Sequence, residues 1–121
     1  MRTPFDRRLV EALSGVSGVH VTPYGPDGAV DHDRLATVVD AIAAAGIDNI
    51  VTGGNTGEFY ALTLDEVRAA CRTAVTANAG RRAVTAGIGR SLADACGLAE
   101  AAAHAGADMV MLHQAPDPFQ S

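Results

Sequence analysis

The stretch Ile50-Val51-Thr52-Gly53-Gly54-Asn55-Thr56-Gly57-Glu58 joins an apolar run to a glycine-rich loop, and Thr63-Leu64-Asp65-Glu66 follows shortly after it. In this second segment Thr63 can cap the backbone N–H of Glu66 while Glu66 reaches back, which is the capping-box pattern of a helix start. The expected order is therefore strand, glycine loop and helix. Glycine permits positive φ and a close approach to the backbone, so free N–H groups in this loop suit an anion.

The same strand–helix order extends in both directions along the chain. Residues 45–51 match residues 105–111, sixty positions later, which corresponds to two units of about thirty residues, the size of one strand–helix step. The expected strands are continuous apolar runs, as in parallel strands buried on both faces. They cover 18–22, 47–52, 83–86 and 109–112. The expected helices cover 5–13, 31–45, 64–79 and 91–105.

The composition is that of one α/β domain. The chain has 121 residues, of which 48% are apolar, and a net charge of −5, so neither nucleic acid nor a membrane is expected as a partner. No apolar run approaches the roughly 20 residues that span a bilayer, and a cytoplasmic location is expected. All nine basic residues are arginines, so the sequence offers no side-chain amine.

Two architectures use units of this kind. A (β/α)₈ barrel needs about 250 residues and eight strands, whereas an open four-stranded sheet would be complete at this length. The glycine loop follows the second expected strand and does not open the first helix, which argues against a dinucleotide-binding sheet. The pattern of elements by itself leaves both architectures open.

The loop Gly54-Asn55-Thr56-Gly57-Glu58, with Leu62-Thr63 and an acidic pair after it, resembles the G-[TSN]-T-G-E loop of the dihydrodipicolinate synthase and N-acetylneuraminate lyase family. The resemblance covers nearly the whole chain. It implies a (β/α)₈ TIM barrel of which residues 1–121 form the N-terminal half of a single domain: a short leading helix, then four strands separated by three helices. Further similar segments are Gly18–Pro23, Asp31–Leu35, Gly46–Asp48, Ala86–Gly89 and Gly106–Asp108.

The resemblance also implies a chemistry. Members of this family are class I lyases in which a lysine amine forms a Schiff base with pyruvate or a 2-keto-3-deoxy sugar acid, and no metal or cofactor is expected. Gly54, Asn55, Thr56 and Gly57 would bind the carboxylate of this 2-oxo acid, and Thr56 would also relay a proton to a catalytic tyrosine. The family's lysine and tyrosine lie on later strands, beyond Ser121, and the complete protein would be a homo-oligomer, a dimer or a tetramer.

The chain departs from the family pattern at two places. Asn55 stands where threonine or serine is usual, so a carboxamide replaces a hydroxyl. The segment Asp117-Pro118-Phe119 has no tyrosine where many relatives lend one to a neighbouring subunit, which favours a sugar-acid aldolase or dehydratase over a diaminopimelate-pathway synthase. Glu58 and His113 are expected to have structural roles, since no partner carboxylate is in view for the histidine.

Two hypotheses of different classes result. The first is that residues 1–121 are part of a longer lyase and are inactive alone, because they contain no lysine. The alternative is a non-catalytic half-barrel, or an open α/β domain, that binds a small carboxylate or serves in assembly. A half-barrel would leave two edge strands and one face of its sheet open, so it would need a partner.

Overall fold

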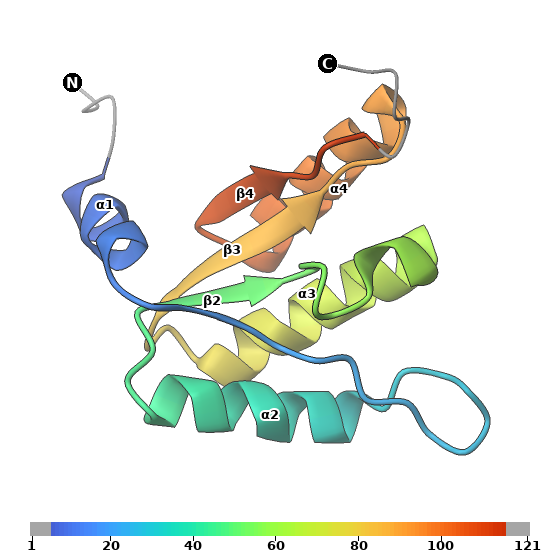
Figure 1. Ribbon diagram of the computed structural model, residues 1–121, viewed down its shortest axis with the longest axis horizontal. Coiled ribbons are helices and arrows are strands. Elements are labelled where there is room, and N and C mark those ends of the chain that lie inside the picture. The colour runs from blue at the N-terminus through green and yellow to red at the C-terminus, as the bar shows by residue number, and fades with distance from the viewer. Residues whose placement is uncertain (1–5, 116–121) are drawn as a thin grey trace.

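The computed structural model describes residues 6–115 and consists of parallel strands that alternate with helices (Figure 1). The strands are β1 (Ser17–Val19), β2 (Asn49–Thr52), β3 (Ala83–Ile88) and β4 (Met109–Leu112). The helices are α1 (Arg7–Ser14), α2 (His32–Ala44), α3 (Leu64–Asn78), α4 (Leu92–Ala105) and a 3₁₀ helix, η1 (Phe59–Ala61).

The sheet has the strand order β1-β2-β3-β4, and every pair of neighbours is parallel. Helices α2, α3 and α4 pack against one another in the same order and cover one face of the sheet (Figure 1). A doubly wound sheet reverses its strand order and carries helices on both faces, so the open-sheet alternative is wrong. The observed arrangement is the N-terminal half of a TIM barrel, as expected.

The core lies between the sheet and these three helices. One cluster joins α2 and α3 to β2 through Leu35, Val39, Ile50 and Ala74, all fully buried. Burial of such side chains contributes about 1.5–3 kcal/mol each for a valine, leucine or isoleucine. A second cluster, towards the C-terminal ends of the strands, contains Phe59, Leu62, Val67, Ile88, Ala95 and Leu98.

The helix ends agree with the signals in the sequence. The Thr63 hydroxyl accepts from the Glu66 N–H at 3.1 Å and the Glu66 carboxylate accepts from the Thr63 N–H at 2.9 Å, so both bonds of the capping box are present. Asp31 and Ser91 cap α2 and α4 in the same manner, with one side-chain bond each. Both helices are followed by a glycine in the left-handed region, which terminates them at low cost.

The sixty-residue repeat corresponds to a repeated pair of hydrogen bonds. The Asp48 N–H donates to the Val16 carbonyl at 3.0 Å, and the Asp48 carboxylate accepts from the Val16 N–H at 2.8 Å. Asp108 forms the same two bonds with Val84, both at 2.9 Å. Each aspartate thus joins the start of its strand to the start of the preceding one, and we call these pairs the aspartate clamps.

Several element boundaries differ from expectation, and one element is additional. The second strand begins at Asn49 rather than residue 47. The first strand ends at Val19 rather than residue 22, although the His20 N–H still donates to the Val51 carbonyl. The third strand continues to Ile88, two residues further than expected. The 3₁₀ helix η1 was not expected at all, because its segment carries none of the usual cap residues. The expected start of the first helix at Phe5 lies outside the described residues.

Candidate functional site

The face of the sheet that α2, α3 and α4 leave uncovered forms a cavity of about 650 Å³. Its floor consists of alternate residues of β1 and β2, one residue of β3 and the whole of β4, and its rim consists of the glycine loop and the residues that follow β4. The residues that line it are Leu13, Ser17, Val19, Asn49, Val51, Gly54, Asn55, Thr56, Thr85, Met109, Val110, Met111, Leu112, His113 and Gln114. In a barrel this face is the interior, and the C-terminal ends of its strands carry the active site.

The glycine loop presents free backbone donors to this cavity. The N–H groups of Gly57 and Phe59 donate to the Gly54 carbonyl, and that of Glu58 donates to Asn55. By contrast, the three consecutive N–H groups of Gly54, Asn55 and Thr56 meet no acceptor within residues 6–115. Successive unpaired amides of this kind form an anion-binding concavity. The side chains of Asn55 and Thr56 are exposed and line the same cavity.

Gly57 has a different position from its neighbours in the loop. It is buried, its N–H is already bonded to Gly54, and its carbonyl accepts from the Thr22 hydroxyl at 2.6 Å. A Cβ at this position would lie 3.0 Å from the His20 carbonyl oxygen. Gly57 can therefore support the loop against the segment after β1, but it offers no free hydrogen-bonding group to a ligand.

A buried histidine fixes the end of β2. The His20 ring is 1% exposed, with Nδ1 2.9 Å from the Val21 carbonyl oxygen and Nε2 2.8 Å from the Thr52 hydroxyl. A carbonyl can only accept, so Nδ1 carries the proton and the Thr52 hydroxyl donates to Nε2. Burial lowers the pKa of His20, because the charged ring would lose its hydration. The residue is thus a neutral structural element directly below the loop.

A second histidine crosses the top of the sheet. His113 directly follows β4, yet its Nε2 lies 2.7 Å from the carbonyl oxygen of Gly53 at the end of β2, so the ring spans β3. Two glycines of β3 and its end make room for it. A Cβ on Gly87 would lie 2.9 Å from Nε2, and one on Gly89 would lie 3.2 Å from the histidine Cβ. These glycines serve as a surface for the ring.

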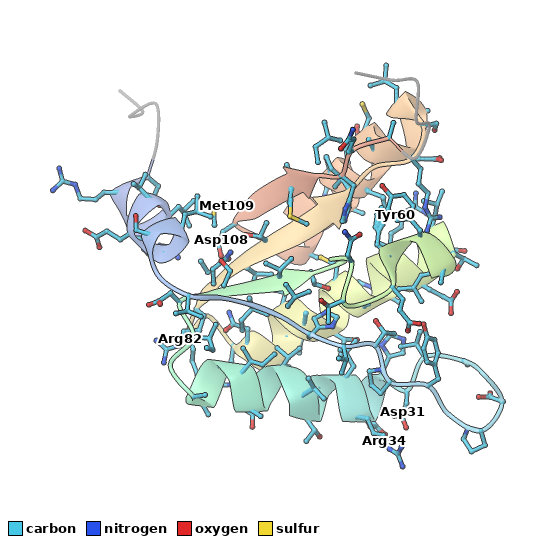
Figure 2. All side chains as sticks on the ribbon, in the orientation of Figure 1. Asp31, Arg34, Tyr60, Arg82, Asp108 and Met109 are labelled. Atoms are coloured by element: carbon cyan, nitrogen blue, oxygen red, sulfur yellow. The ribbon has the colours of Figure 1, made fainter. Side chains whose placement is uncertain are left out.

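The segment after the loop is held by aromatic and cationic contacts. The Phe59 ring packs against His113 with centroids 4.4 Å apart, and the Tyr60 hydroxyl donates to the Gln114 carbonyl at 2.7 Å. Arg90 lies 5.1 Å above the Phe59 ring and donates to the carbonyls of Phe59 and Leu62. Figure 2 shows Tyr60 at this end of the sheet, far from Asp108 and Met109 at the other.

Glu58 stands at the start of η1. It adopts left-handed backbone angles (φ 63°), and its side chain makes no capping hydrogen bond. It lies beside Tyr24, where desolvation, followed by the effect of the Glu58 carboxylate, raises the pKa of the phenol.

The described residues that line the cavity include one histidine, His113, and no arginine, aspartate or glutamate. An anion bound here would be held by dipoles.

Within residues 6–115 no three side chains of the metal-ligating types converge on one point, and no helix has both the length and the apolarity needed to cross a bilayer. The segment Asp117-Pro118-Phe119, considered for a subunit contact, lies outside the described part of the chain.

Sequence reasoning found the loop but missed the two side chains that hold it, His113 and Arg90. The one signal for His113 was the pair Gly87 and Gly89, two positions apart and so on one face of a strand. Such a pair leaves space for a neighbouring side chain. The sequence offers no comparable signal for Arg90, whose reach to Phe59 and Leu62 depends on its own left-handed backbone.

Comparison with known proteins gives a consistent result. The model of the dihydrodipicolinate synthetase family matches residues 12–116. A probable 5-dehydro-4-deoxyglucarate dehydratase 1 of Streptomyces coelicolor is 46% identical over 88 residues, which are 73% of this chain and 28% of that protein. The crystal structure of dihydrodipicolinate synthase from Bacillus clausii superposes with a TM-score of 0.89 at 43% identity, over 93% of this chain and 38% of that one.

A third similar structure is YagE of Escherichia coli K12, a prophage protein of the dihydrodipicolinic acid synthase family that was crystallised in complex with pyruvate. It is 29% identical with a TM-score of 0.82, over 88% of this chain and 36% of that one. The chain therefore spans between roughly a quarter and two fifths of the length of these relatives.

Proposed function

The chain belongs to the dihydrodipicolinate synthetase family, and we propose that residues 1–121 supply the carboxylate-binding half of a lyase acting on 2-oxo acids. The observation that carries this proposal is the run of three unpaired N–H groups at Gly54, Asn55 and Thr56 on the rim of the cavity. In the proposed domain organisation these residues belong to the first half of a single (β/α)₈ barrel.

In the proposed reaction a lysine amine attacks the ketone carbon of the 2-oxo acid and water leaves. The resulting protonated imine accepts the electron pair released when the neighbouring carbon–carbon bond breaks, or when a proton is removed from the carbon next to it; in the second case the enamine then expels a β-hydroxyl, which leaves with its bonding pair and a proton as water. The 121-residue sequence holds no lysine, so this amine must come from outside it. The present residues would hold the carboxylate with preorganised N–H dipoles, which need no reorganisation as charge develops.

We assign Thr56 the further role of proton relay, because its exposed hydroxyl adjoins the same unpaired amides. Asn55 would place a carboxamide beside the carboxylate, where it can donate as well as accept. The substrate class is pyruvate or a 2-keto-3-deoxy sugar acid. This substrate class is supported by three similar proteins: one named as a synthase, one named as a probable dehydratase, and one crystallised in complex with pyruvate.

Titration of the chain with pyruvate, followed by amide NMR, tests the binding site. We expect the largest shifts at the N–H groups of Gly54, Asn55 and Thr56, because they would donate to the carboxylate. Pyruvamide is the matched control: it keeps the ketone and lacks the negative charge, so it should leave these signals in place. Shifts confined to other residues, or equal effects of both compounds, would contradict the proposed site.

The proposed lyase chemistry is tested with the protein encoded by the complete reading frame that contains these residues. Treatment with pyruvate and borohydride should reduce the imine and add one pyruvate-derived group to a lysine, which peptide mass spectrometry locates. If no lysine is modified while the amide shifts are present, the alternative of a non-catalytic carboxylate-binding module is correct.

A further inference from the structure

Within the described residues, His113 makes the one side-chain hydrogen bond that joins the end of β4 to the end of β2. Its Nε2 lies 2.7 Å from the Gly53 carbonyl oxygen, although β3 separates the two strands. A histidine that merely filled space could be replaced by any ring of similar size. Here the polar atom meets a backbone carbonyl at hydrogen-bond distance, directly before the three unpaired amides of the loop.

The chemistry of the contact fixes the direction of the bond. The Gly53 carbonyl can only accept, so the His113 Nε2 atom carries the proton and donates it. The neutral ring in this tautomer and the doubly protonated ring can both donate from Nε2. The bond therefore does not depend on the protonation of Nδ1, which suits a constant mechanical role and not a proton transfer through Nε2.

The bond acts at a point where the backbone is free to turn. Gly53 has a φ of 71° and is followed by a second glycine, so the peptide planes that aim the loop amides are not restrained by side chains of their own. On the far side of the loop, the rings of Phe59 and Tyr60 pack against the same imidazole, with centroids 4.4 and 5.6 Å away. One side chain thus contacts both ends of the loop.

We propose that His113 is the positioning residue of the glycine loop: by donating to Gly53 across the glycines of β3, it sets the direction of the Gly54, Asn55 and Thr56 amides. This inference rests on the proposed carboxylate site. It assigns His113 no contact with the reacting atoms, and it explains the glycines at position 87 of β3 and at position 89 just after it, where a Cβ would crowd the ring.

Two substitutions separate the hydrogen bond from the packing. His113→Leu keeps an apolar group of similar length and removes the donor, and His113→Gln keeps an N–H donor at about the distance of Nε2. We expect His113→Leu to weaken pyruvate binding by about tenfold, the equivalent of one hydrogen bond, and His113→Gln to stay within about threefold of the parent. Equal affinity in the leucine variant, or equal weakening in both, would overturn the proposal.

Two measurements work without a ligand, so the inference can be judged even if pyruvate does not bind. The Gly57 and Glu58 amides, bonded inside the loop, should exchange with solvent about tenfold faster in His113→Leu and normally in His113→Gln. Imidazole NMR of the parent protein should show the Nε2-protonated tautomer of His113. The Nδ1-protonated tautomer would overturn the proposal. This measurement uses the parent protein, so it remains decisive if His113→Leu fails to fold.

Discussion

The two ends of the parallel sheet are joined by different means. At the N-terminal end, charged and amide side chains bind backbone groups of the neighbouring strand, as the aspartate clamps of Asp48 and Asp108 do. At the C-terminal end, Gly53 and Gly87 bring bare backbones together, and the amides of Gly54, Asn55 and Thr56 stay unpaired. Polar side chains hold backbone groups at both ends, but only the C-terminal end also leaves consecutive backbone N–H groups free for a ligand.

The difference follows the division of labour in parallel barrels, where the N-terminal face serves stability and the C-terminal face serves chemistry. Here it can be stated atom by atom. A carboxylate that already accepts two hydrogen bonds, such as that of Asp108 from Val84 and Arg8, has little capacity for a ligand. A backbone N–H without an acceptor can still donate its hydrogen bond to a ligand. Substitutions at the two ends should therefore separate stability from binding.

The largest expected effect is that of Gly87→Ala. Its Cβ would lie 2.0 Å from the Gly53 carbonyl oxygen and 2.9 Å from the His113 Nε2, so β2 and β3 would have to move apart. We expect a loss of about 3 kcal/mol or more in the free energy of unfolding, measured by chemical denaturation. Gly97→Ala is the control: it lies within α4 with its nearest atom 3.5 Å away, and it should stabilise by about 0.5–1 kcal/mol.

The next largest effect is expected for Thr56→Val, which should lower turnover without changing stability. Thr56→Val keeps the shape of the side chain and removes its hydroxyl, and Thr56 is exposed, so stability should stay within about 0.5 kcal/mol. In the complete enzyme we expect turnover to fall by on the order of 10²-fold. Near-normal turnover in a steady-state assay would mean that the loop is only a turn. Thr56→Ser, which keeps the hydroxyl, should retain most of the activity.

At the opposite end, removing a clamp should affect stability alone. Asp48→Ala leaves the exposed Val16 N–H without its carboxylate partner, and we expect a loss of about 0.5–1.5 kcal/mol. Asp48→Asn keeps an acceptor oxygen and should lose less. Pyruvate titration of the folded variants should give the parent affinity. A weaker affinity would mean that the two ends of the sheet are coupled through the strands, so that stability and binding are not separate.

The smallest expected effect is a pH dependence caused by His20. Because its pKa is lowered in the folded state, the unfolded chain takes up a proton first as pH falls below the usual value of about 6.5. Stability is therefore complete above this pH and decreases below it until the folded pKa is reached, by at most about 1.4 kcal/mol per pH unit. Denaturation at several pH values measures this slope, and His20→Gln should reduce it.

The fold was predictable because its signals are local. The capping box at Thr63 and Glu66 needs only a spacing of three residues, and the sixty-residue repeat needs only a comparison of the chain with itself. The unexpected 3₁₀ helix η1 has no such signal, since Phe59, Tyr60 and Ala61 favour no particular turn. Its position is set by contacts of Phe59 and Tyr60 with His113, which follows another strand.

The site was predictable only in part, because only some of its contacts are local in sequence. The glycine loop is continuous in sequence, so its free amides could be expected from residues 53–57. The contact between His113 and Gly53 requires the register of three strands and the absence of side chains on the middle one. The sequence supported a structural role for His113, but it could not show that the residue lines the cavity or which carbonyl the ring contacts.

The aspartate clamps have an evolutionary consequence. Their two copies occupy equivalent registers sixty residues apart, and each follows a helix that ends at a left-handed glycine, Gly46 or Gly106. A crossover between two gene copies at these glycines would therefore join strands that already share the same start. The glycine–aspartate junctions are therefore natural breakpoints for building chimaeras from this chain.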